Sequence, residues 1–360
     1  MPDLRDLSGE TYLEAKALPD IIAERCVHTL IEVASCQACV DVCPRDAWSL
    51  EDEQLGIDVN RCDGCNLCVA ACTQGAIQAD TAPALKEQDG HTIAMLACEL
   101  AGGLPGAGVV PCLHAFSLNA LMTLYRRGVK SMACRTGDCD NCRRGEASRL
   151  STRLNKFNQL LRERSLPEMR YRELSADEWS ELARKKNGEA DGTLMSRRQF
   201  FRRTARAAIT GHEQLRSSGA ALVNGLEPVG SIIPSRDPTQ TVPFLPEIVP
   251  TRCNACGACA QLCPHGAIRL ENADHTDNRA YLIQSDQCTG CGICTDVCDQ
   301  QAVSVLTWAR PIVLRIPLSV YRCRSCGAVY HTPTENPPRD RRCRICVQTN
   351  HNKLLYQVMD

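Results

Sequence analysis

The spacing of eight cysteines in the last third of the chain constrains the fold more than any other feature. The first four follow C-x2-C-x2-C-x3-C-P, and the next four repeat this spacing with Asp299 in place of the proline. Thiolates at this spacing hold two [4Fe–4S] clusters, because three close ligands bind one cluster and the fourth crosses to the other. Structural zinc sites favour paired C-x2-C knuckles that lie farther apart. The rule assigns Cys253, Cys256, Cys259 and Cys298 to one cluster, and Cys263, Cys288, Cys291 and Cys294 to the other.

This stretch resembles a bacterial-type two-cluster ferredoxin, and an upstream part of the chain repeats the pattern. The two copies lie about 220 residues apart, which indicates an internal duplication. The upstream copy has one complete ligand set by the same crossing rule. This set is Cys43, Cys62, Cys65 and Cys68.

The second ligand set of the upstream copy lacks one cysteine, because Val33 stands where the spacing requires it. Cys26 is the only nearby replacement, and it would otherwise be a free cysteine without an evident role. A three-iron cluster and a non-thiolate ligand such as His28 are the alternatives. The set favoured by the sequence is Cys26, Cys36, Cys39 and Cys72.

Residues 90–142 have a different pattern, in which short apolar segments alternate with an amphipathic one. TIAMLAC, GAGVVPC and VKSMAC are typical of buried strands, and SLNALMTLYRRG predicts a helix capped by Ser117 and ended by Gly128. Strand, helix and strand in this order predict a small parallel α/β unit. Ligands of such units gather at the carboxyl ends of the strands. Each predicted strand ends in a cysteine, and these are Cys98, Cys112 and Cys134.

The turn that follows adds Cys139 and Cys142, which gives five candidates for a four-thiolate site. Cys134, Cys139 and Cys142 fit the C-x4-C-x2-C spacing of plant-type [2Fe–2S] sites. With a cysteine at each strand end, the helix, and then GVKSMACRTGDC, the region also resembles the delta subunit of methyl-viologen-reducing hydrogenase and heterodisulfide-reductase systems. That resemblance implies a [2Fe–2S] cluster on Cys98, Cys112, Cys134 and Cys139. We expect Cys98 to be a ligand and Cys142 to lie outside the site.

The C-terminal segment contains two C-x2-C knuckles, which are typical of a tetrahedral metal site. The first knuckle resembles that of rubredoxin, although the second lacks the proline and glycine of that family. The spacing does not distinguish zinc from iron, and we favour zinc in a ribbon. The ligands are Cys323, Cys326, Cys343 and Cys346.

The predicted fold is multidomain α+β and α/β, with two bacterial-ferredoxin-like modules, a central small parallel α/β domain and a C-terminal four-cysteine ribbon. Ser175 and Glu178 predict a capping box that opens one further helix in the central domain. The expected divisions are a helical lead-in (1–25), the first ferredoxin module (26–82), the α/β domain (90–187), a basic helix and linker (188–247), the second ferredoxin module (248–308) and the ribbon (309–360).

Charge and composition predict a soluble protein of the cytoplasm. The first sixteen residues lack the apolar segment of a secretory leader, and clustered cysteines without a leader indicate metal ligation in a reducing compartment. The most apolar window contains Glu99, His114 and prolines, which excludes a transmembrane helix. Residues 310–360 carry 9 Lys/Arg against 3 Asp/Glu, whereas the whole chain has a net charge of −1. Opposite charges on different modules indicate docking surfaces.

Four cubanes and a [2Fe–2S] centre without a catalytic constellation predict an electron-transfer subunit rather than a stand-alone enzyme. The resemblance of the central domain implies redox partners of the hydrogenase, formate-dehydrogenase or flavoprotein type. One alternative is a catalytic reductase subunit with an open-site cluster in the α/β domain. The other is a redox-sensing nucleic-acid-binding protein that uses the basic ribbon, which is less favoured because four cubanes exceed what a sensor needs.

Overall fold

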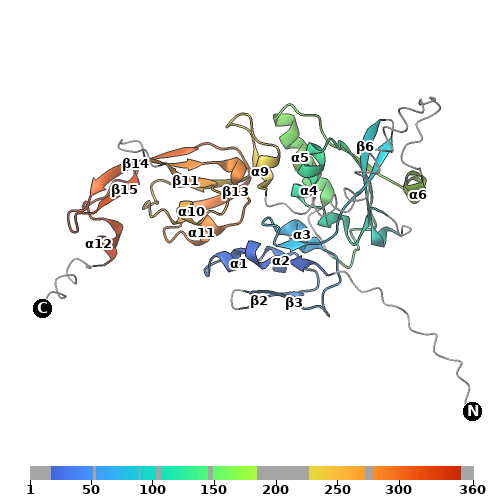
Figure 1. Cartoon of the computed structure of the whole chain (residues 1–360), viewed down its shortest axis with the longest axis horizontal. Helices are drawn as coiled ribbons and strands as arrows, with labels where there is room; N and C mark the ends of the chain where they lie inside the picture. The colour runs from blue at the N-terminus through green and yellow to red at the C-terminus, as the bar shows by residue number, and fades with distance from the viewer. Residues whose placement is uncertain are drawn as a thin grey trace, which may run out of the picture.

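The computed structural model describes residues 18–51, 54–88, 90–102, 107–144, 149–184, 227–271 and 279–349. The molecule is elongated, with the α/β domain at one end, the second ferredoxin module next to it and the C-terminal segment at the other end (Figure 1). The first ferredoxin module lies beside both the α/β domain and the second module (Figure 1). The basic helix expected after residue 188 lies outside the described residues. No helix in the described part of the chain is long and apolar enough to cross a bilayer.

The first ferredoxin module is built from two antiparallel strand pairs and short helices that carry cysteines. Strand β1 pairs with β4, and β2 pairs with β3. The helices α2 and α3 contribute Cys39 and Cys68. The elements are β1 (Asp20–Ile21), α1 (Val27–Leu30), α2 (Ala38–Asp41), β2 (Trp48–Glu51), β3 (Gln54–Ile57), α3 (Leu67–Ala71) and β4 (Ile77–Gln78).

The described part of the expected helical lead-in contains a short strand, β1, followed by one 3-10 helical turn at Ala23–Arg25. Residues 1–17 lie outside the described part, and Asp20–Ile21 forms β1 instead of a helix. The pairing of Ile21 with Ile77 explains the difference, because the strand supplies an apolar side chain to the module's core. Tertiary pairing therefore overrides a weak helical pattern that Pro19 already interrupts.

The second ferredoxin module repeats the strand pairing of the first. Strand β10 pairs with β13 as β1 does with β4, and β11 pairs with β12 as β2 does with β3. The helices α10 and α11 carry Cys259 and Cys294, which correspond to Cys39 and Cys68. The elements are β10 (Val242–Ile248), α10 (Ala258–Gln261), β11 (Ile268–Glu271), β12 (Ala280–Ile283), α11 (Ile293–Asp296) and β13 (Val303–Ala309).

Residues 227–247, the described part of the segment expected to be a basic helix and linker, are part of the folded molecule. Helix α9 (Val229–Ile232) packs into the core of the α/β domain, and β10 pairs with β13 along its length. Pro243 and Pro246 lie in β10, where they are tolerated because β13 is its only sheet neighbour among the described strands. The proline-rich composition therefore conceals an edge strand and a helix.

The α/β domain contains a five-stranded sheet with the predicted parallel core. Strands β6 and β8 are parallel, β8 and β9 are parallel, and the short β7 pairs in parallel with the end of β6. The antiparallel β5 completes the sheet beside β6. The elements are β5 (Ala84–Gln88), β6 (His91–Cys98), β7 (Val109–Val110), α4 (Leu118–Arg126), β8 (Ser131–Arg135), α5 (Leu150–Glu163), β9 (Arg170–Glu173) and α6 (Ala176–Arg184).

Local sequence signals position the helices of this domain. The Ser117 hydroxyl accepts a hydrogen bond from Ala120 N at 3.2 Å, and Gly128 follows α4 with φ of +91°. Ser175 N donates to the Glu178 carboxylate at 2.8 Å while Glu178 N donates to the Ser175 hydroxyl at 3.3 Å, which confirms the capping box. Helices α4, α5 and α9 share one core with one face of the sheet, whereas α6 inserts Trp179 against the other face.

The C-terminal segment continues a sheet of the second ferredoxin module. Strand β14 (Arg315–Arg322) pairs with β12, and β15 (Val329–Pro333) pairs with β14. The four strands form one sheet in the order β11-β12-β14-β15, and α12 (Arg344–Gln348) follows (Figure 1). The segment is thus joined to the second module by backbone hydrogen bonds rather than hung from it by a linker.

Candidate metal centres

The eight cysteines of the second ferredoxin module surround two small cavities. One cavity is lined by the sulfur-bearing residues Cys253, Cys256, Cys259 and Cys298. The other is lined by Cys263, Cys288, Cys291 and Cys294. These are the two sets that the crossing rule gives, so each cavity has the four thiolates that a cubane requires.

Three of the four short cysteine-bearing helices are preceded by a residue with left-handed backbone. Gly257 and Gly292 have φ of +83° and +82° and begin α10 and α11. Asn66, with φ of 61°, has the same place before α3. Glycine and asparagine adopt this conformation most readily, and it turns the chain so that successive cysteines face one centre.

Burial and mutual repulsion make these thiols poor thiolates in the absence of a positive charge. Burial, together with the charges of neighbouring cysteines, raises the pKa of Cys68, Cys259 and Cys294 to about 12. A bound metal ion reverses this effect, because coordination deprotonates a thiol outright. The grouping of four mutually repelling sulfurs therefore fits an iron–sulfur cluster.

Backbone N–H groups point at the sulfurs of the crossing cysteines in both modules. Each crossing cysteine accepts a hydrogen bond from the amide four residues later, at 3.2 to 3.4 Å. Hydrogen bonds to ligand sulfurs help to set the potential of a cluster. The four acceptors are Cys43, Cys72, Cys263 and Cys298.

Cys26 lies with the incomplete ligand set of the first module. After burial, the charges of Cys72 and Cys36 are among the causes that raise the Cys26 pKa, and Cys26 in turn raises the pKa of Cys39. Val33 is 62% exposed. The Nε2 atom of His28 lies 2.7 Å from the Cys36 carbonyl oxygen and so donates to it, which engages this ring nitrogen. The structure thus brings Cys26, and not Val33, to the other three cysteines.

In the α/β domain, four of the five candidate cysteines interact with one another. Burial raises the pKa of Cys98, and the charge of Cys142 adds to this increase. Burial also raises the pKa of Cys139, and the charge of Cys98 adds to it. Burial raises the pKa of Cys112 to about 11, with smaller contributions from the charges of Cys98 and Cys139. The grouped residues are therefore Cys98, Cys112, Cys139 and Cys142.

Cys134 does not join this group in the described structure. It is fully buried, and only burial and the charge of Glu173 raise its pKa. In the parallel register Cys134 lies opposite Leu96, two residues before Cys98 on the same face of the sheet. Two residues along a strand correspond to about 6.6 Å, so Cys134 lies one pleat deeper than Cys98.

His114 is a residue of this site that the sequence did not single out. Its Nδ1 accepts a hydrogen bond from Leu150 N at 3.1 Å, so the proton is on Nε2. Nε2 lies 3.4 Å from the Cys139 sulfur and donates to it. Burial, followed by the charges of Arg153 and Arg149, lowers the His114 pKa to about 4, which keeps the ring neutral.

Arg144 is a second residue missed from the sequence, and it joins this site to the first ferredoxin module. Its side chain is only 3% exposed and contacts Asp63 at 3.2 Å and Glu99 at 2.6 Å. It also donates to the carbonyl oxygen of Pro111, and the Cys98 sulfur lies 3.6 Å from the same oxygen. The sequence gives no signal that Arg144, which follows another arginine in the segment RRG, is buried.

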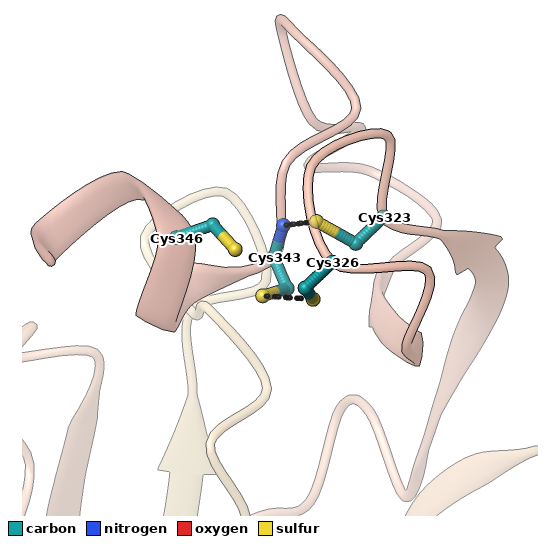
Figure 2. Close-up of side chains that lie close together, drawn as sticks. All are labelled: Cys323, Cys326, Cys343 and Cys346. Carbon is teal, nitrogen blue, oxygen red and sulfur yellow. Dashed lines mark hydrogen bonds between the residues drawn. The ribbon is translucent and has the colours of Figure 1, made fainter. Parts of the chain in front are cut away.

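The four C-terminal cysteines form a compact group at the meeting of two loops and a helix (Figure 2). Their sulfur atoms all lie within 4.8 Å of one another, and those of Cys326 and Cys343 are 3.9 Å apart. Four sulfurs at about 2.3 Å from one ion are roughly 3.8 Å apart, which matches a mononuclear site. Although burial opposes it, backbone N–H groups, including that of Cys343 at 3.2 Å, lower the pKa of Cys323 to about 6.

Comparison with known proteins identifies the two cysteine-rich modules. Residues 34–77 and 252–302 each match a family model described as a 4Fe-4S dicluster domain. A 60-residue stretch is 35% identical to the protein named "Putative electron transport protein YsaA" of Escherichia coli (strain K12). That match covers 16% of this chain and 38% of the E. coli protein. The chain therefore contains two ferredoxin-type iron–sulfur modules.

Proposed function

We propose that this protein relays single electrons between partner oxidoreductases along a row of metal centres. The observation that carries the proposal is that residues in or next to the cysteine groups contact the neighbouring module at each boundary. Electron tunnelling weakens steeply with distance, so adjacent centres conduct and distant ones do not. Part of the chain is similar to an Escherichia coli protein named as a putative electron transport protein, which agrees with this function.

The first contact in the row joins the α/β domain to the first ferredoxin module. Cys112 of the α/β domain packs in one apolar cluster with Cys65 and Leu67 of the ferredoxin module. Arg144 bridges the same boundary through Asp63, whose carboxylate also accepts from Cys65 N at 3.2 Å. These contacts support electron exchange between the α/β site and the cluster on Cys43, Cys62, Cys65 and Cys68.

The second contact joins the two ferredoxin modules. Ser35, which precedes Cys36, donates to the Asp296 carboxylate of α11 from its backbone N at 2.9 Å and from its hydroxyl at 2.7 Å. Gln74 donates to the Thr289 hydroxyl and lies 3.1 Å from the ring of His265. Thr289 stands between Cys288 and Cys291, so this boundary brings a cluster of each module together.

We further propose that the α/β site holds a [2Fe–2S] cluster and that the C-terminal site holds zinc, with iron as the alternative. The partners would be of the hydrogenase, formate-dehydrogenase or flavoprotein type, as the resemblance of the α/β domain to a delta subunit implies. One-electron acceptance is the chemistry that the clusters supply when bound. The chain's own residues hold the sulfurs, donate N–H groups to them and join one module to the next.

Metal analysis of the anaerobically purified full chain tests this proposal. We expect about 18 iron atoms, from four cubanes and one two-iron centre, together with matching sulfide and one zinc. The clusters should be reduced in one-electron steps that EPR detects. About eight irons, with zinc in the remaining cysteine sites, would contradict a relay of this length.

Arg144→Met is expected to lower the reduction potential of the cluster that contains Cys65. A buried cation favours the reduced cluster, which carries one more negative charge, and its loss should shift the potential by tens of millivolts, on the order expected for one nearby charge. EPR-monitored redox titration measures the shift. Arg45→Met is the matched control, because Arg45 also approaches Asp63, at 3.7 Å, but is 37% exposed. Equal shifts in both variants would exclude a special role for Arg144.

A further inference from the structure

The end of the row opposite the α/β domain carries a groove between the second ferredoxin module and the C-terminal segment. The groove has a volume of about 510 Å³. Its walls include Cys256, a cubane ligand, and Cys343, a ligand of the C-terminal site. Asn336 ties the two walls together, because its amide donates to the Cys253 carbonyl oxygen at 2.9 Å. Two metal centres therefore border one surface feature.

The groove combines exposed apolar side chains with a basic edge. Val329, Ile345 and Val347 line it and are 62%, 51% and 57% exposed. Arg339 and Arg344 also line it, and neither has a carboxylate partner among the residues that the structure describes. Exposed apolar side chains next to charged ones are usual in a protein–protein interface.

From this surface we infer that the groove docks an acidic electron-carrier protein, and this inference rests on the relay proposed above. The C-terminal segment from residue 310 has a formal charge of +6 in a chain whose total is −1. An acidic partner is attracted to this end by long-range electrostatics. The exposed Cys326 and the half-buried Cys256 bring the metal sites close to such a partner. The groove therefore belongs to the end of the row at which electrons leave or enter.

A nucleic acid is the other macromolecule that a basic surface attracts, and the groove favours a protein instead. Phosphate binding needs a dense row of cations, whereas this groove is lined by three arginines, one of them paired with Asp340, and by exposed aliphatic side chains. Tyr330 and His331 also line the groove but are half-buried, so the groove offers no row of exposed aromatic faces on which bases could stack. The nucleic-acid partner is therefore an outcome of the test below rather than part of the inference.

Binding of an acidic flavodoxin to the anaerobic full chain tests the inference by calorimetry at low and high salt. The parent should bind, and added salt should weaken binding. Arg339→Glu with Arg344→Glu should weaken it by about tenfold or more, and Val347→Ser should weaken it several-fold. The matched control is Arg127→Glu with Lys130→Glu, which makes the same charge change at exposed positions of the α/β domain and should leave binding unchanged. Zinc and iron content verifies that each variant is folded.

Three results would overturn the docking assignment. They are no flavodoxin binding by the parent, equal weakening in the groove and control variants, and tight salt-sensitive binding of a DNA or RNA oligonucleotide in place of flavodoxin. Failure of the relay is a separate result, because it appears as missing or irreducible clusters in the parent. If the clusters are reduced normally but the groove variants bind as the parent does, the relay stands and the groove is not the dock.

Discussion

Cys26→Ala is expected to convert one cubane of the first module to a three-iron cluster or to remove it. The structure brings Cys26 to Cys36, Cys39 and Cys72. The position at which the spacing requires a cysteine holds Val33, which faces solvent. Iron content should fall by about one to four atoms, and EPR of the oxidised protein should show a three-iron signal if the cluster persists. The other three cubanes should be unchanged.

His28→Ala is the control for this experiment, because His28 is the alternative ligand. Its Nε2 donates to the Cys36 carbonyl, so its loss should leave four cubanes in place. If Cys26→Ala has the iron content and spectrum of the parent while His28→Ala loses a cluster, the ligand is His28. Parental spectra in both variants would point to a three-iron site in the native protein.

Cys142→Ala is expected to abolish the two-iron centre of the α/β domain, whereas Cys134→Ala should retain it. The charges of Cys98, Cys112, Cys139 and Cys142 affect one another, while Cys134 lies deeper in the sheet beside Glu173. The visible absorption and the EPR signal of the reduced two-iron cluster distinguish the variants. Buried Cys134→Ala also leaves a small cavity, which should lower stability by about 1 kcal/mol without removing iron.

The opposite pattern would restore the ligand set that the family resemblance implies. In that case Cys142→Ala keeps the cluster and Cys134→Ala loses it, and cluster binding would have to pull Cys134 toward the strand end. Cys98→Ala serves as the reference, because both ligand sets include Cys98. A cluster that survives in Cys98→Ala would exclude both sets.

The sequence predicts what depends on local spacing. The cysteine groups of the second module follow from one repeated motif, and the cap at Ser117 and the capping box at Ser175 follow from single residues. Such features depend on a few neighbouring positions, so they need no knowledge of the tertiary fold.

The sequence does not predict what depends on register and on distant pairing. Cys134 ends an apolar run, but β8 continues to Arg135, and the pairing of Cys134 with Leu96 sets it back from Cys98. The two prolines of residues 242–248 argue against a strand in the sequence, and only the pairing with β13 shows that this segment is an edge strand. The burial of Arg144 likewise depends on Asp63, which is 81 residues away in the chain.

The order of the modules in space differs from their order in the chain, and this makes the two duplicated copies unequal. The first ferredoxin module has neighbours at both of its clusters, through Cys112 on one side and Thr289 on the other. The second has a module neighbour at one cluster and the groove at the other. In the relay proposed above, loss of a cluster in the first module separates the α/β site from the second module, whereas loss of the cluster beside the groove only shortens the relay. Equivalent substitutions in the two copies therefore have different consequences for the molecule, although the ligand motifs are nearly the same.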